Sequence, residues 1–453
     1  METNMTTGRP MGLIFRFTVP LFLGNAFQQI YNMADSMIVG KFVSANALAA
    51  VGSTGTIMFL VLGIAIGLTT GFSVMTSQYY GAGNSQGVHY SVTNGILMSI
   101  VFTLFLTAVS LFSMPGLLRL MNTPEDIFDD ALRYISIICA GTVAIMFYNL
   151  FAAYLRAIGN SKTPLFFLVF SAILNILLDL LFIVSFHMGV AGAALATVAA
   201  QGLSAVLCAI YIYRHVDALR PDKTDWHFVG TCAAKQLSIG IPMALETGIT
   251  ASGTPIMQAA LNIYGTLSIA GSTAAYKVIN FLSQGLYSLG QTMASYAGQN
   301  FGSGKIERIW SGTKAAMVLV IIYSLSAAGL GVVFLPHLIS LFFSGDVSLA
   351  EVLPWAKIAH HECALFYPFL GAIFVYRNTL QGCGFSVQAM AMGVFELGAR
   401  ICMALLSMHI HSYPLAIGAD PSAWLAAGTL GYILYRYLLG NKHKSVVQGD
   451  GEG

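Results

Sequence analysis

Apolar stretches long enough to cross a lipid bilayer recur from one end of the chain to the other. A hydrocarbon core of about 30 Å is crossed by roughly 20 helical residues. A span must be helical because lipid offers no other partner to its backbone N–H and C=O groups. The pattern therefore predicts an all-α integral membrane protein with twelve transmembrane helices. They are expected near 13–39, 51–78, 92–113, 132–154, 164–186, 190–213, 236–262, 272–298, 312–334, 356–378, 388–409 and 421–439.

The composition supports this class and excludes several others. Of the 453 residues, 56% are hydrophobic and only 9% are charged, whereas about a quarter of a soluble domain is charged. The net charge of +2 is small and the basic residues are dispersed, so no nucleic-acid partner is expected. The six cysteines show neither a CxxC pair nor a regular spacing, which argues against a disulfide framework and a metal site.

The chain also contains an internal repeat, with an offset of roughly half its length. The segment SQYYGAGN at 77–84 corresponds to GQNFGSGK at 298–305, and LRAIGNS at 155–161 corresponds to LQGCGFS at 380–386. The glycine turns lack the GxxxxGK[ST] spacing of a phosphate-binding loop. They are interpreted as tight turns, and neither a nucleotide-driven motor nor an enzyme is expected.

The repeat predicts two pseudo-symmetric six-helix lobes, because an even number of spans returns each half to the same side of the membrane. We expect an N-terminal lobe at 1–215, a polar cytoplasmic linker at 216–235 and a C-terminal lobe at 236–453. Internal symmetry of this kind is typical of secondary transporters, in which the two halves rock around the substrate.

The distribution of Lys and Arg predicts the orientation in the membrane. Most of these residues, Arg377 among them, lie at the termini or around the even-numbered connections between spans, and few flank the odd-numbered ones. The positive-inside rule therefore places both termini in the cytoplasm.

Ionisable residues inside the spans carry most of the functional information, because a carboxylate at a helix centre costs roughly 2.5–3.5 kcal/mol. Asn175 and Asp179 are four residues apart and share one helix face. Asp179 precedes the outward turn by about as many residues as Thr197 follows it, which places both at one depth. Asp35 is expected at a similar depth. These oxygens predict a site for protons or a monovalent cation, although hydrogen bonding between helices would also use such residues.

Other charged residues in the spans receive simpler interpretations. Glu396 and Arg400 are also four residues apart and are expected to neutralise each other. Glu362 lies near the outer end of the tenth span, where an interfacial position explains it. The HHEC segment at 360–363 does not match a zinc-protease motif, so no metal is expected beyond a sodium ion at the carboxylates.

Five motifs together are more specific than any one of them: MADSMIVG at 33–40, LRAIGNSKTP at 155–164, NILLD at 175–179, GVAGAALATVAAQ at 189–201 and AGQNFGSGK at 297–305. They resemble motifs of the bacterial branch of the multidrug and toxic compound extrusion (MATE) family. The likeness covers the chain from the first span to Trp424. It implies a monomeric transporter of a bacterial cytoplasmic membrane that exports drugs or metabolites in exchange for sodium ions or protons, without a cofactor.

The family's N-lobe cation site, carried over by motif, falls on the same four oxygen-bearing residues. The resemblance also implies substrate contacts from Gln28 and from Asn149. Some members have acidic residues in the seventh and tenth spans, but here Glu246 lies about one turn from the expected position and Leu370 occupies the other. Lys277 resembles a lysine of some bacterial members, and would pair with Glu246 or contact an anionic substrate.

The predicted mechanism is alternating access. Unloaded Asp35 and Asp179 favour a cationic amphiphile, and an entering proton or sodium ion neutralises them and bends the first helix near Pro20, so that the drug leaves outward. The alternative is a flippase or exporter of a lipid-linked or anionic substrate with the same architecture, although few Lys or Arg lie inside the spans. An intramembrane aspartyl protease would need YD and GxGD contexts, which neither aspartate has.

Overall fold

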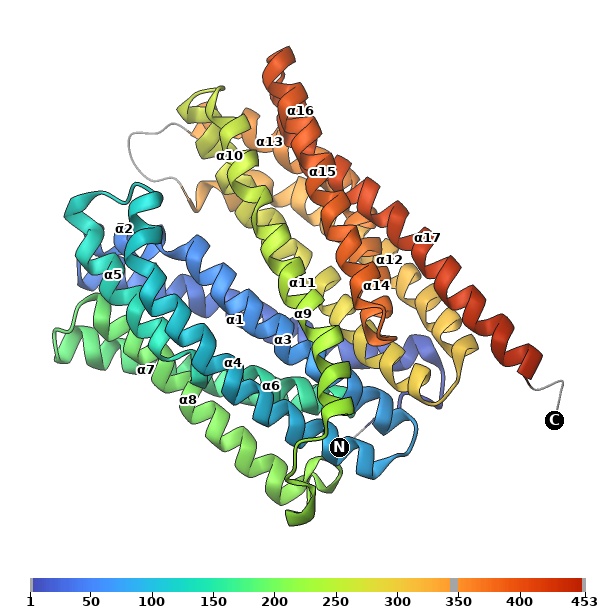
Figure 1. The fold of residues 1–453 in the computed structure, drawn as a ribbon. Helices are drawn as coiled ribbons and strands as arrows, with labels where there is room; N and C mark the ends of the chain where they lie inside the picture. Colours follow the sequence, from blue (N-terminus) through green and yellow to red (C-terminus); the bar gives the residue numbers. More distant parts are fainter. Residues whose placement is uncertain (1–2, 343–348, 450–453) are drawn as a thin grey trace. The chain divides into compact units, whose positions relative to one another are not determined.

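The computed structural model describes residues 3–342 and 349–449, with the backbone alone for 442–449. All regular structure in this part of the chain is helical (Figure 1). The first half contains α1 (Pro10–Phe42), α2 (Ala45–Ser53), α3 (Gly55–Gly81), α4 (Ser85–Leu120), α5 (Glu125–Ala140), α6 (Thr142–Ala157), α7 (Lys162–Asp179), η1 (Leu180–Ser185) and α8 (Val190–His215). The linker contains η2 (Asp217–Leu219) and η3 (Lys223–Asp225). The second half contains α9 (Gly230–Ala251), α10 (Gly253–Asn262), α11 (Thr266–Gly302), α12 (Ile306–Ser340), α13 (Leu349–Leu365), α14 (Tyr367–Gly382), α15 (Ser386–Ile410), α16 (Tyr413–Ile417) and α17 (Ala419–Gly449).

Every predicted span falls on one helix or on consecutive helices. By length and composition, 7 of the described helices are able to cross a membrane, or up to 9 if each of two bent pairs counts as one span. The bent pairs are α5 with α6, at 47°, and α13 with α14, at 49°. Pro20 lies inside α1 and Pro242 inside α9, so neither proline ends its helix.

The repeat is visible in the backbone. The two bent pairs occupy equivalent places in the two halves. Gly83 and Gly304 have φ of 69° and 73°, and Gly159 and Gly384 have φ of 83° and 88°. Glycine adopts such positive values without the steric cost of a β-carbon. Each of the four repeated motifs therefore contains a turn at its glycine, directly after the end of a helix.

The described residues form two compact units. Unit 1 consists of Met1–Asn4 and Leu23–Gly248, and unit 2 of Met5–Phe22 and Ile249–Gly453, each over its described residues. Helices α1 and α9 thus contribute residues to both units: Met5–Phe22 of the first half belongs to unit 2, and the part of α9 up to Gly248 belongs to unit 1. The predicted lobe boundaries stay a prediction.

Hydrogen bonds hold the segment from Met5 to the start of α1 in unit 2. The Met5 N–H donates to Gln299 Oε1 at 2.9 Å, and the Met5 carbonyl accepts from Asn300 Nδ2 and from Arg308, each at 3.1 Å. Arg308 also donates to the Gly8 carbonyl at 3.0 Å. Polar residues of the GQNFGSGK motif at 298–305, together with Arg308 after it, therefore anchor the segment that leads into α1.

The start of the second half is held in unit 1 in a corresponding way. The Val229 N–H donates to Asn94 Oδ1 of α4 at 2.9 Å. Helix α9 then packs closely on α3, since a β-carbon at Gly67 would lie 2.7 Å from the Cα of Ala244. Backbone approach of this kind is available to small residues alone, which explains the glycines of this stretch of α3.

Candidate functional site

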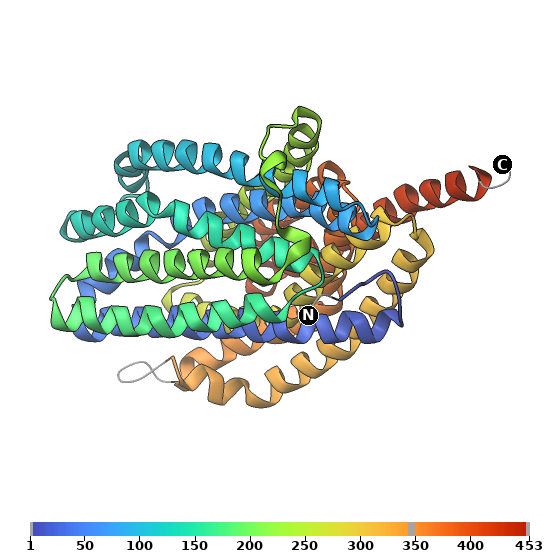
Figure 2. The ribbon, with the colours of Figure 1, turned by 90° about the horizontal axis from the view of Figure 1, so that it is seen from below.

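The hairpin of α7 and α8 carries three of the four residues predicted to bind a cation. The π-helical turn η1 extends α7 before the chain turns back, and the two helices lie side by side in both views (Figure 1, Figure 2). Asn175, Asp179 and Thr197 are only 2%, 0% and 8% exposed. Buried polar groups need hydrogen-bond partners, so their contacts with each other define the site.

The Asn175 amide joins Asp179 to Thr197. In the orientation that satisfies both of its ends, its nitrogen donates to Asp179 Oδ2 at 3.3 Å, and its oxygen accepts from the Thr197 N–H at 3.2 Å and from the Thr197 hydroxyl at 3.3 Å. The opposite orientation places Nδ2 against the Thr197 hydroxyl, also at 3.3 Å. We adopt the first orientation because it supplies a donor to a buried carboxyl group.

Asp35 of α1 completes the group. Its side chain lies within hydrogen-bonding distance of the Asp179 carboxyl. In both residues Oδ1 is buried and has no hydrogen-bond partner among the described residues. Two carboxylates this close repel each other, so the contact requires a proton or a cation between them. The four residues predicted for cation coupling therefore form one connected group within unit 1.

Two further polar residues join this group at positions that helical spacing marks. The Tyr31 side chain lies close enough to those of Gln28, Gln201 and Asp35 for electrostatic interaction. Tyr31 precedes Asp35 by four residues in α1, and Gln201 follows Thr197 by four in α8. An i,i+4 search around the predicted residues would have found both. Gln28, predicted to contact substrate, is thereby linked to the carboxyl group.

Tyr134 is a third residue that the sequence did not indicate. It lies on α5 and is buried, close enough to Asp35, Tyr31 and Asp179 for electrostatic interaction. No spacing relates α5 to α1 or to α7 along the chain, so its place in the group depends on the packing of unit 1.

The other three residues predicted to contact substrate lie on α6, α9 and α11. Asn149 Nδ2 donates to the Ile145 carbonyl of its own helix at 2.8 Å. Glu246 is buried on α9 in unit 1. Lys277 is exposed on α11 in unit 2, with its ammonium group 5.2 Å from the centre of the Phe342 ring. Their roles stay predictions.

The predicted pair of Glu396 and Arg400 is confirmed and belongs to a larger network. Arg400 Nη2 lies 3.1 Å from Glu396 Oε1, Arg400 Nε lies 2.8 Å from Asp420 Oδ1, and Arg377 Nη2 lies 2.8 Å from Glu396 Oε2. Arg377 requires a correction, because it was counted among the charges around a connection between spans. Its side chain is buried in α14 and paired with Glu396, so it is not a solvated loop charge.

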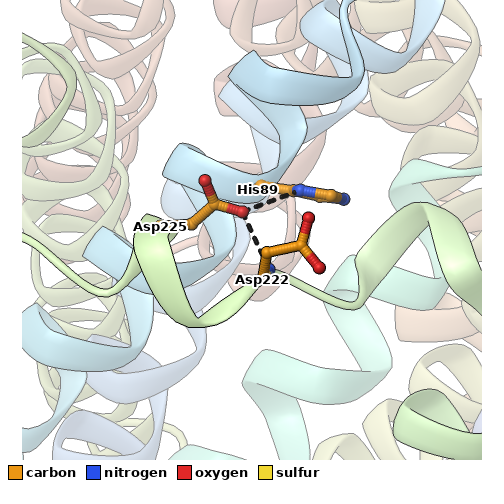
Figure 3. Close-up of side chains that lie close together, drawn as sticks. All are labelled: His89, Asp222 and Asp225. Atoms are coloured by element: carbon orange, nitrogen blue, oxygen red, sulfur yellow. Dashed lines mark hydrogen bonds and ion pairs between the residues drawn. The ribbon is translucent and has the colours of Figure 1, made fainter.

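A second polar cluster lies where the linker meets α4 (Figure 3). Asp225 Oδ2 accepts from the Asp222 N–H at 2.8 Å and lies 3.0 Å from His89 Nδ1, and Asp225 Oδ1 accepts from Gln86. Burial alone would raise the pKa of Asp225, but these hydrogen bonds hold it below its ordinary value. The side chains of His89, Asp222 and Asp225 are close enough to hold a metal ion. The bonds to Asp225 already use both of its oxygens, so the cluster is better explained as an anchor of the linker.

Residues 20–181 and 242–406 match the family model described as MatE. A Bacillus subtilis protein, "Probable multidrug resistance protein YpnP", is 30% identical over 441 residues, which make up 96% of each chain. A Thermotoga maritima protein, "Probable multidrug resistance protein NorM", is 23% identical over 94% of this chain and 90% of the relative.

Solved structures share the fold. One, described as the "outward-facing conformation of a multidrug resistance MATE family transporter of the MOP superfamily", aligns with a TM-score of 0.90 over 97% of this chain and 98% of the other, at 20% identity. A MOP superfamily transporter from Pyrococcus furiosus aligns with a TM-score of 0.91 over the same shares, also at 20% identity. The predicted fold class, an all-α membrane protein with twelve helices in two lobes, is thereby confirmed.

Proposed function

Because the chain belongs to the MatE family of membrane transporters, we propose that it is a secondary active antiporter. It exports cationic or amphiphilic drugs or metabolites in exchange for H+ or Na+ by alternating access. It acts as a monomer in a bacterial cytoplasmic membrane with both termini in the cytoplasm, and it is neither an enzyme nor dependent on a cofactor.

The paired carboxyls of Asp35 and Asp179 carry this proposal. They lie within hydrogen-bonding distance of each other, with Asn175 and Thr197 beside them. An oxygen cluster of this kind suits protons or a hard monovalent cation, since either removes the repulsion between the carboxylates. Loading and unloading of this pair is therefore a charge change inside the membrane, which is what an ion-coupled transporter requires.

Helix α1 is suited to transmit that charge change. Asp35 lies in the part of α1 that belongs to unit 1, and Pro20 lies in the part that belongs to unit 2, close to Phe22 where that part ends. A proline removes one intrahelical hydrogen bond and permits a bend. Neutralising Asp35 weakens the interactions of the outer part of α1 and biases this bend, so that substrate is released outward.

The substrate contacts follow from the same group. Tyr31 lies close enough to both Gln28 and Asp35 for electrostatic interaction, so a substrate at Gln28 and a cation at Asp35 influence each other through one shared residue. We retain Asn149, Glu246 and Lys277 as further substrate contacts.

The experiment measures ethidium efflux from vesicles that contain the purified protein, with a pH gradient and a sodium gradient imposed separately. We expect one gradient to drive efflux by the wild type. Asp35→Asn and Asp179→Asn are expected to reduce that efflux to the passive leak, because each leaves a single carboxyl group with no second carboxylate whose repulsion a proton or a cation must offset. Asp129→Asn is the matched control, since Asp129 is exposed on α5, and it should behave like the wild type.

Two outcomes would overturn the proposal. If Asp35→Asn and Asp179→Asn retain the gradient-driven efflux of the wild type, the pair does not couple transport. If neither gradient drives ethidium efflux by the wild type, the flippase or exporter of a lipid-linked or anionic substrate becomes the better assignment. Lys277→Gln should then abolish transport of the anion.

A further inference from the structure

A cavity of about 840 Å³ lies between α12 and α17 in unit 2, apart from the residues predicted for cation coupling and substrate binding. Aromatic and charged side chains dominate its lining. They are Glu307, Trp310, Lys314, Tyr432, Arg436 and Tyr437. Figure 1 shows α12 in yellow to orange and α17, the last helix of the chain, in red.

The cavity has two cations against one anion. Lys314, Arg436 and Glu307 are all exposed, and none of the three takes part in a salt bridge within the described residues. The Arg436 guanidinium lies 5.2 Å from the centre of the Trp310 ring. A cation–π contact orients a guanidinium without neutralising it. The cavity therefore presents a positioned positive charge and a second one nearby.

The position of Lys314 along α12 places the cations of the cavity at a membrane surface. Helix α12 has 35 residues, so it is about 52 Å long, whereas the hydrocarbon core is about 30 Å thick. The excess of roughly 20 Å is divided between the two ends. Lys314 follows the first residue of α12, Ile306, by about two turns, which corresponds to the headgroup boundary. Trp and Tyr are enriched at this boundary in membrane proteins.

An apolar stripe continues from the cavity into the membrane. Beyond Lys314, Val318, Ile321, Ile322 and Leu325 of α12 are exposed. Ile321 and Ile322 each lie three or four residues from both Val318 and Leu325, so the four side chains share one face of the helix. In a membrane helix, such exposed apolar side chains contact acyl chains. A basic and aromatic cavity is thus followed directly by a surface for hydrocarbon.

We propose that this cavity binds the headgroup of an anionic phospholipid. The phosphate lies between Lys314 and Arg436, and the acyl chains follow the stripe from Val318 to Leu325. Basic pockets between membrane helices bind anionic headgroups in this way. Glu307 accepts hydrogen bonds from headgroup hydroxyls, and the excess of one positive charge favours an anionic headgroup over a zwitterionic one.

Tryptophan quenching by brominated lipids tests this assignment on the full-length protein. The protein is reconstituted into phosphatidylcholine vesicles that contain a small share of dibromo-phosphatidylglycerol, dibromo-phosphatidylethanolamine or dibromo-phosphatidylcholine. The Trp310→Phe variant identifies the part of the signal that comes from Trp310. We expect the phosphatidylglycerol to quench Trp310 at a concentration lower by on the order of tenfold than the other two lipids.

The variant Lys314→Gln/Arg436→Gln should lose this preference. Its matched control is Lys162→Gln/Arg214→Gln, which removes two exposed cations from helix ends of unit 1 and should keep the preference. Equal quenching by the three lipids, or a preference that survives in the first variant, would overturn the proposal. Complete competition by millimolar glycerol 1-phosphate would show a site for a free phosphate ester, and would overturn the assignment to a lipid.

Discussion

Replacing Arg400 by methionine removes one cation from the buried network of unit 2 while keeping most of the aliphatic volume. Arg400, Glu396 and Arg377 are 7%, 6% and 7% exposed, so water does not replace the lost contacts. Glu396 keeps its bond of 2.8 Å to Arg377. Asp420 loses the Arg400 guanidinium, which is its ion-pair partner at 2.8 Å within the described residues.

The magnitude follows from that uncompensated carboxylate. Breaking a buried pair by removing one partner destabilises a protein by about 3–5 kcal/mol, whereas removing both charges is much less costly. We therefore expect Arg400→Met to lower the free energy of unfolding by about 3 kcal/mol or more. The double variant Arg400→Met/Asp420→Asn should recover a substantial part of this loss, because no buried charge is left unpaired.

The assay is reversible unfolding in mixed micelles, in which the fraction of dodecyl sulfate is raised and helix content is followed by circular dichroism. Arg133→Met is the control, since Arg133 is exposed and a surface change of this kind is within about 0.5 kcal/mol of neutral. The reasoning is refuted if Arg400→Met unfolds like the control. It is also refuted if the double variant is no more stable than the single one.

Two further predictions concern unit 1. Because its hydrogen bonds hold the pKa of Asp225 below its ordinary value, the ionised form stabilises the folded linker above about pH 4 and this stabilisation is lost as the pH falls through the lowered pKa. The rate of amide hydrogen exchange at 222–229, corrected for its intrinsic pH dependence, should be unchanged from pH 7 to 5 and should rise below pH 4. The Asp225→Asn variant should exchange fast at every pH. Protection of the wild-type amides that does not change with pH would contradict this prediction. Gly67→Ala places a methyl group 2.7 Å from the Cα of Ala244 and should cost about 1–3 kcal/mol in the same unfolding assay. Gly55→Ala, with nothing within 4 Å, should be neutral or stabilising, and equal stability of the two variants would contradict close packing of α3 on α9.

Much of the candidate site was accessible from helical spacing. Asn175 and Asp179 were placed on one face, and Glu396 and Arg400 were paired, by the same i,i+4 rule. The rule extends to Tyr31, four residues before Asp35. The rule works because side chains three or four residues apart lie on the same face of a helix, whichever helix packs against it.

Contacts between distant helices were not accessible in this way. Tyr134 of α5 lies close to the carboxyl groups of Asp35 and Asp179. Arg377, expected near a connection between spans, is instead buried and paired with Glu396. No periodicity along one helix indicates which neighbour its polar residues will meet. These contacts appear only when several helices pack at once.

The sequence by itself determined that the chain is helical, crosses a membrane repeatedly and consists of two related halves. Lipid forces each span to satisfy its own backbone, so these properties depend on local composition and on the repeat. The tertiary structure decided that Met5–Phe22 joins unit 2 and that the start of α9 joins unit 1. Many apolar helix faces are nearly equivalent as packing surfaces, and the choice among them depends on a few close approaches and buried hydrogen bonds, such as Gly67 on Ala244 and Gln299 on Met5.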